Sequence, residues 1–65
     1  MLSLPMRYVD VIFEDGTKEN VAMQDTLDKK EAHEFQTDWS VWRDKKVVRV
    51  ELRKRDGTVL KFFEF

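Results

Sequence analysis

The sequence predicts an α+β fold with two layers, in which an antiparallel sheet of two hairpins packs on one helix in the order β-β-α-β-β. Two stretches of alternating apolar and polar residues each surround an Asp-Gly pair, at 15–16 and at 56–57. Such a pair between alternating runs is typical of a hairpin turn. The segment between the hairpins carries apolar residues at helical spacing and contains no Gly or Pro. Antiparallel strands with one helix favour a two-layer domain.

The first hairpin is expected to turn at Gly16, with residues 18–23 as its return strand. A two-residue loop would place polar residues of the return strand on the apolar face of the first strand. A three-residue loop with Gly16 in the left-handed conformation pairs Phe13 with Thr17 and gathers the apolar residues instead, so we predict this register. The shared face would then hold Val9, Val11, Val21 and Met23.

The second hairpin follows the same reasoning around Gly57. A three-residue loop again gathers the apolar side chains on one face. It also sets Glu51 opposite Lys61, which is a favourable pair across two strands. The residues predicted on this apolar face are Val48, Val50, Leu52, Leu60 and Phe62.

The helix is predicted from about residue 26 to about residue 37, with Asp25 as its N-cap. Its apolar stripe continues into Trp42, which is assigned either to the core or to the rim of an interface. The side chains expected to cover the sheet are Leu27, Ala32, Phe35 and Trp39.

The length of 65 residues indicates a single domain, residues 1–65, with a small core. The chain has no cysteine and one histidine, His33, which excludes disulfides and sites built from thiolates or several histidines. We therefore expect no metal and no other cofactor. Small domains without such links often gain stability by self-association.

The sequence does not favour a membrane location. No stretch approaches the roughly 20 apolar residues of a membrane span. Residues 1–6 lack a basic region and are too short for the apolar part of a signal peptide. We expect a cytoplasmic protein without a membrane partner.

Catalysis is not expected, because His33 has no evident nucleophile partner and Ser40 does not sit in a nucleophile elbow. Both glycines are explained by hairpin turns rather than by a phosphate-binding loop. The polar side chains of the helix are expected to be solvated. These are Glu31, His33, Glu34 and Asp38.

The sheet face that the helix leaves uncovered is the predicted functional surface. Under the predicted register, Val47 lies opposite Phe65 and Arg49 lies opposite Phe63. An aromatic and aliphatic centre with a charged rim is typical of a protein interface. The residues expected at this surface are Tyr8, Ile12, Trp42, Val47, Arg49, Arg53, Val59, Lys61, Phe63 and Phe65.

The main functional hypothesis is a small non-enzymatic protein that binds another protein and self-associates, as a homodimer, through this face. Its size suits an accessory, regulatory or inhibitor-type protein, such as those of phages and mobile elements, or a subunit of a larger complex. The alternative is single-stranded nucleic-acid binding, in which aromatic rings stack on bases and basic side chains contact phosphates. The net charge of −1 argues against it. A third possibility is a solvated face, with Phe63 and Phe65 completing the core under Trp42.

Overall fold

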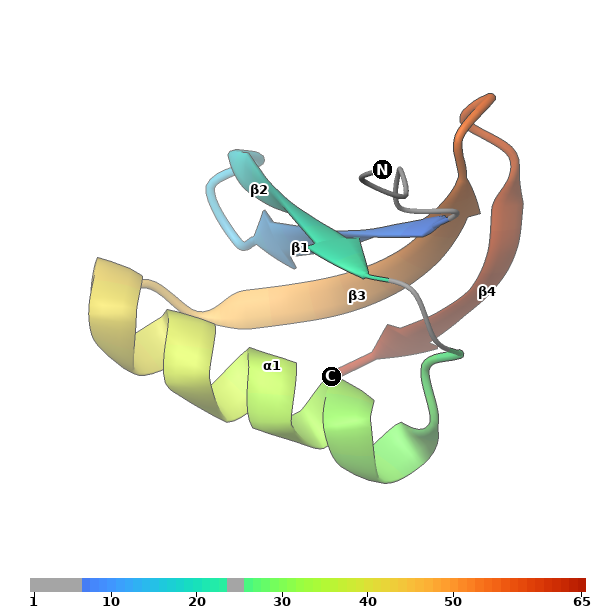
Figure 1. Ribbon diagram of the computed structural model, residues 1–65. Coiled ribbons are helices and arrows are strands. Elements are labelled where there is room, and N and C mark those ends of the chain that lie inside the picture. The colour runs from blue at the N-terminus through green and yellow to red at the C-terminus, as the bar shows by residue number, and fades with distance from the viewer. Residues whose placement is uncertain (1–6, 24–25) are drawn as a thin grey trace, which may run out of the picture.

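The computed structural model describes residues 7–23 and 26–65. In these residues the elements are β1 (Arg7–Phe13), β2 (Lys18–Met23), α1 (Lys29–Arg43), β3 (Val47–Lys54) and β4 (Val59–Glu64). The strands form one antiparallel sheet in the order β2-β1-β3-β4, and α1 lies across one face of it (Figure 1). The predicted fold class is confirmed.

The core lies between α1 and the sheet face that α1 covers, here called the inner face. Leu27 and Ala32 are fully buried there, and Phe35 and Trp39 pack against the core as half-buried side chains. All four therefore cover the sheet as predicted. The buried apolar residues are Val9, Val11, Phe13, Leu27, Ala32, Val47, Val50 and Leu52.

The helix begins and ends later than predicted. Its N-cap is Asp28, whose carboxylate accepts from the Glu31 backbone N–H at 2.7 Å, while Glu31 accepts from the Asp28 N–H at 3.3 Å. This capping box fixes the start of α1, and the predicted N-cap, Asp25, lies outside the described residues. The helix continues past residue 37 to Arg43, and it ends at Asp44 in a left-handed conformation with φ of 51°.

The first hairpin has the predicted loop and register. The Phe13 N–H donates to the Thr17 carbonyl at 2.9 Å, and Gly16 adopts a φ of 88°. Val9 lies opposite Val21, and the pairing of β1 with β2 continues along both strands without a shift. This register places the half-buried Val21 and Met23 against the core.

The second hairpin has the predicted loop but a different register along its strands. Its turn repeats the first one, because the Lys54 N–H donates to the Thr58 carbonyl at 2.9 Å and Gly57 has a φ of 93°. The pairing then shifts by one residue, so that Leu60 has no partner in β3. This β-bulge sets Lys61 opposite Leu52, and the predicted Glu51–Lys61 pair is wrong.

A second shift occurs where β3 begins. Ile12 lies opposite Arg49, whereas the next residue, Phe13, lies opposite Val47. The irregularity turns Val47 into the core, where it is fully buried. Its backbone N–H donates to the Ser40 hydroxyl of α1 at 3.2 Å, which ties the start of β3 to the helix.

Candidate partner-binding surface

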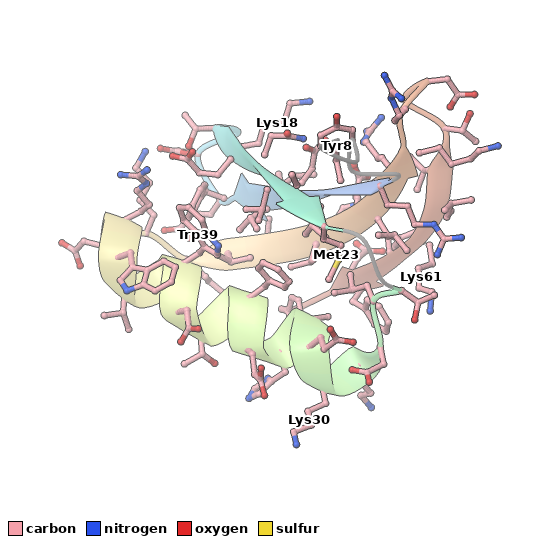
Figure 2. The ribbon with its side chains drawn as sticks, in the orientation of Figure 1. Tyr8, Lys18, Met23, Lys30, Trp39 and Lys61 are labelled. Atoms are coloured by element: carbon pink, nitrogen blue, oxygen red, sulfur yellow. The ribbon has the colours of Figure 1, made fainter. Side chains whose placement is uncertain are left out.

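The sheet face away from α1, here called the outer face, is dominated by charged and polar side chains. Tyr8 and Lys18 lie on this face, whereas Met23 and Lys61 lie on the side of the helix (Figure 2). One row of the outer face crosses all four strands, because each residue lies opposite the next in the antiparallel pairing. From β2 to β4 this row consists of Asn20, Asp10, Glu51 and Phe62.

Glu51 is the centre of this outer face and is only 6% exposed. Arg49 Nε donates to its Oε2 at 2.7 Å, and Arg53 Nη2 donates to its Oε1 at 2.8 Å. Burial raises the pKa of the Glu51 carboxyl, but the hydrogen bonds from Arg53 and Arg49 outweigh burial. The pKa therefore lies below its usual range, and Glu51 is ionised at neutral pH.

Asp10 is the second buried carboxylate of the outer face, with 5% exposure. Asn20 donates to its Oδ1 at 2.8 Å. Arg53 Nε lies 2.9 Å from its Oδ2 in an ion pair that lacks the alignment of a hydrogen bond. Lys18 approaches the same oxygen at 3.9 Å. Asp10 is thus neutralised by side chains of the neighbouring strands β2 and β3, whereas Glu51 is neutralised by two arginines of its own strand.

Arg49 and Arg53 belong to this charge network rather than to a free basic rim. Arg49 also lies 3.7 Å from Glu64 and stacks over the Phe62 ring, with 3.8 Å from its guanidinium carbon to the ring centre. A guanidinium already paired with carboxylates has little capacity left for a phosphate. The outer face therefore does not favour the nucleic-acid alternative.

Several residues predicted on the uncovered face lie on the inner side instead. Val47 is in the core, and Phe63 lies opposite Val50 and packs against the core. Lys61 is exposed on the inner side of β4. Phe65 follows β4 and lines a groove of about 630 Å³ with Phe63 at the start of α1. The other side chains of this groove are Lys29, Lys30, His33 and Glu64.

Two bulges explain these corrections. Side chains alternate between the two faces of a strand, so a shift of one residue moves a side chain to the opposite face. The shift at the start of β3 moves the Val47 side chain to the inner face. The unpaired Leu60 moves the side chain of every later residue of β4 to the face opposite the predicted one. Phe63 does complete the core, as one alternative proposed. It does so beside the start of α1, whereas Trp42 lies in the last turn of the helix.

Besides Arg49 and Arg53, the predicted residues that do not turn to the inner face of the sheet are Tyr8, Ile12, Val59 and Trp42. Tyr8 and Ile12 lie on the outer face of β1, opposite Arg53 and Arg49 of β3. Val59 lies opposite Arg53 and is exposed. Trp42 lies in the last turn of α1 and is 64% exposed.

The strand β4 carries most of the exposed apolar surface. Six large apolar side chains are exposed among the described residues, and four of these lie in β4 or directly after it. Phe62 and Leu60, which the sequence had placed on the helix-covered face, belong to this group. The four residues are Val59, Leu60, Phe62 and Phe65. The sequence does not identify these four residues as exposed, because it contains no signal for the bulge and the turn itself follows the expected pattern.

The backbone of β4 is also open on one side. The Phe65 N–H donates to the Val48 carbonyl at 2.9 Å. In an antiparallel ladder, residues alternate between those bonded to the neighbour and those whose N–H and C=O groups point away. Phe62 and Glu64 therefore direct their backbone groups away from β3. Because β4 is the last strand in the order of the described sheet, no strand of residues 7–23 and 26–65 pairs with them.

The potential ligands of the helix do not form a metal site in the described residues. His33 lines the groove next to Phe63, whereas Glu31, Glu34 and Asp38 line a separate groove next to Trp39. No group of three or more suitable side chains gathers anywhere within 7–23 and 26–65. Within the same ranges, no helix has the length and apolar character required to cross a bilayer.

Comparison with known proteins found no matching family model, no significantly similar curated protein and no significantly similar solved structure. The functional conclusion therefore depends on the geometry of the chain itself.

Proposed function

We propose that this chain is a small cytoplasmic, non-enzymatic protein-binding module that self-associates by pairing β4 of one copy with β4 of a second copy. The observation that supports this proposal most strongly is the coincidence of an open backbone edge with exposed apolar side chains in the same strand. Phe62 combines both features, since it is 48% exposed and its backbone groups point away from the sheet. An exposed apolar edge strand is a template for pairing with another chain.

A second copy of the chain suits this edge because β4 carries apolar side chains on both faces. Val59 and Phe62 lie on the outer side, and Phe63 lies on the inner side. The added strand must therefore offer apolar groups on both faces as well, and β4 itself has this composition. Burial of the edge in a dimer would also enlarge the small apolar core of the domain.

Symmetry determines how two β4 strands meet. A two-fold axis perpendicular to the sheet brings them together in antiparallel orientation and keeps each sheet face on the same side. With the axis at Phe62, its outward backbone groups bond those of Phe62 in the second copy. The two rings then meet on the outer face, and Lys61 lies beside Phe63 of the second copy on the inner face.

Sedimentation velocity over a range of concentrations tests the proposal. We expect a monomer–dimer equilibrium for the natural chain and a monomer for Phe62→Lys, because the new charges would face each other at the axis. The matched control is Ala22→Lys, which adds the same charge at an exposed position of the opposite edge strand, β2. This control should dimerise like the natural chain.

Amide hydrogen exchange distinguishes edge pairing from stacking of two outer faces. Edge pairing should slow exchange at Phe62 and Glu64 as concentration rises, and leave the outward amide of Asn20 in β2 unchanged. A natural chain that stays monomeric up to millimolar concentration would refute self-association. Equal dimerisation of Phe62→Lys and Ala22→Lys would show that β4 is not the interface.

A further inference from the structure

A groove with acidic and aromatic walls runs along α1 on the side of β2. Its volume is about 270 Å³, and it is open to solvent along the helix. Three of its side chains are carboxylates, four are apolar, and none is basic. The lining residues are Met23, Glu31, Glu34, Phe35, Asp38, Trp39 and Trp42.

The aromatic wall consists of both tryptophans of the chain. Trp39 and Trp42 contact each other edge to face, with ring centres 5.1 Å apart and ring planes at 80°. Trp39 is partly buried against the core, and Trp42 remains 64% exposed. The pair thus offers a rigid apolar surface beside the carboxylates, and large aromatic side chains are the usual anchors of protein interfaces.

Within residues 7–23 and 26–65, no basic side chain forms an ion pair with the carboxylates of the groove. Glu31 accepts a hydrogen bond in the capping box of α1. Glu34 and Asp38 have no ion-pair partner among the described residues. They lie four residues apart on the same helix face, where like charges destabilise a helix. A cationic group placed between them would relieve this repulsion.

At the C-terminal end of α1, the Arg43 side chain already lies between a tryptophan ring and a carboxylate. The Arg43 guanidinium carbon lies 5.4 Å from the centre of the Trp39 ring, and Arg43 Nε lies 2.9 Å from Glu19. Tryptophan is the best of the aromatic rings for such a contact. A lysine or arginine of a partner could meet the same combination of groups at Trp42 and Asp38.

We propose that this groove binds a basic, amphipathic segment of another protein. Leucine-like side chains of the segment contact Met23, Phe35 and the tryptophans, and its lysine or arginine side chains pair with Glu34 and Asp38. The groove lies beside β2, at the opposite edge of the sheet from β4. Binding is therefore independent of self-association and is available to the monomer and the dimer alike.

Tryptophan fluorescence of the full chain tests this proposal, because both reporters line the groove. The probe is a short peptide of alternating lysine and leucine without aromatic residues. We expect a saturable change in emission with this peptide and none with the corresponding glutamate–leucine peptide. Steep loss of affinity with added salt should accompany the change, because the charged groups are exposed.

Two double variants that remove the same amount of charge show whether the peptide binds in the groove. Glu34→Gln combined with Asp38→Asn should weaken binding about tenfold, because two exposed ion pairs are lost. The control, Glu14→Gln combined with Asp44→Asn, removes two exposed carboxylates outside the groove. It should bind like the natural chain. Neutral side chains at 34 and 38 should not lower the melting temperature, since they remove a repulsive pair.

Trp42→Ala separates the apolar contribution from the charges. The side chain is exposed, so we expect the fold to remain and binding, measured by calorimetry, to fall at least about tenfold. Equal affinity of the two charge-matched double variants would overturn the proposal, as would equal binding of the glutamate–leucine peptide. Lack of any saturable response to the lysine–leucine peptide would overturn it as well.

Discussion

The two hairpins of this domain have the same turn but end in different edge strands. Each turn contains Asp-Gly-Thr, closes the same pattern of backbone hydrogen bonds and places its glycine at positive φ. In β2 the exposed residues are small or polar, as is common for protected sheet edges. These are Lys18, Asn20 and Ala22. In β4 they include Phe62 and Leu60.

The difference arises after the turn. The first hairpin keeps one register from end to end, whereas the second hairpin shifts at Leu60. That single residue moves Phe63 into the core and Phe62 onto the outer face, beside Arg49. A turn motif therefore determines the loop, but the register farther along depends on which side chains fit the core.

The largest effect is expected where the two hairpins meet. Val50 is fully buried, and it lies opposite Val11 of β1 and Phe63 of β4. Val50→Asp should cost about 4 kcal/mol or more, because it buries an unpaired charge. That cost is comparable with the whole stability of a small domain. Circular dichroism during urea titration should show a chain that is largely unfolded without urea.

The control for this variant is Val59→Asp, which introduces the same charge at an exposed valine of β4. We expect a cost below about 1 kcal/mol. Similar losses in the two variants would mean that Val50 is not part of a core shared by both hairpins.

A pair of deletions tests the register difference directly. Leu60 has no partner in β3, so its deletion removes the bulge and leaves residues 61–65 opposite their present partners. We expect a loss below about 1 kcal/mol. Deletion of Asn20 shifts the end of β2 by one residue and turns Val21 and Met23 away from the core, at a cost of about 2 kcal/mol. Chemical denaturation measures both losses. Unfolding by the Leu60 deletion, or equal losses, would contradict the assigned bulge.

The sequence was sufficient to predict the order of the elements, the two loops and the register of the first hairpin. These features follow from local signals, namely alternation, Asp-Gly turns and helical spacing. The stripe through Phe35 and Trp39 also identified the covering face of the helix. The start of the helix was misplaced because acidic residues at 25 and 28 compete as N-caps, and the capping box with Glu31 decides between them.

The surface was predicted less well, because it depends on non-local packing. Val47 could be assigned only from the irregularity opposite Phe13, and Phe63 only from the bulge at Leu60. A prediction that assumes strict alternation of side chains along each strand does not reveal these shifts. The burial of Asp10 and Glu51 on the uncovered face was also not predicted, since charged residues are rarely buried unless they are paired.

If the two loops are equivalent, substitution of either turn glycine by alanine should lower the stability equally. Gly16 and Gly57 have φ values of 88° and 93°, and an added Cβ would meet no atom within 4 Å in either turn. Alanine should therefore cost about 1 kcal/mol at each position, from backbone strain alone. Urea denaturation of the two single variants measures this. A much larger loss at one glycine would show that the loops differ after all.

The smallest effect concerns Lys45, which forms an ion pair with the aspartate of the first turn. Hydrogen bonds from the Thr17 hydroxyl and backbone N–H, followed by the bond from Lys45, lower the pKa of Asp15 from 3.8 to about 2. Lys45 Nζ lies 3.0 Å from Asp15 Oδ2. In the other turn, the hydrogen bonds of Thr58 are the main cause of the lowered pKa of Asp56.

Because folding lowers the pKa of Asp15, its stabilising contribution is complete above pH 3.8 and is lost as the pH falls through about 2. Lys45→Ala should raise the pKa of Asp15 slightly and leave that of Asp56 unchanged. Thr17→Ala should raise the pKa of Asp15 more, since the hydroxyl bond of 2.6 Å is the larger cause. Carbon NMR titration of the side-chain carboxyls measures both values. A larger rise with Lys45→Ala than with Thr17→Ala would assign the lowered pKa to charge rather than to the turn itself.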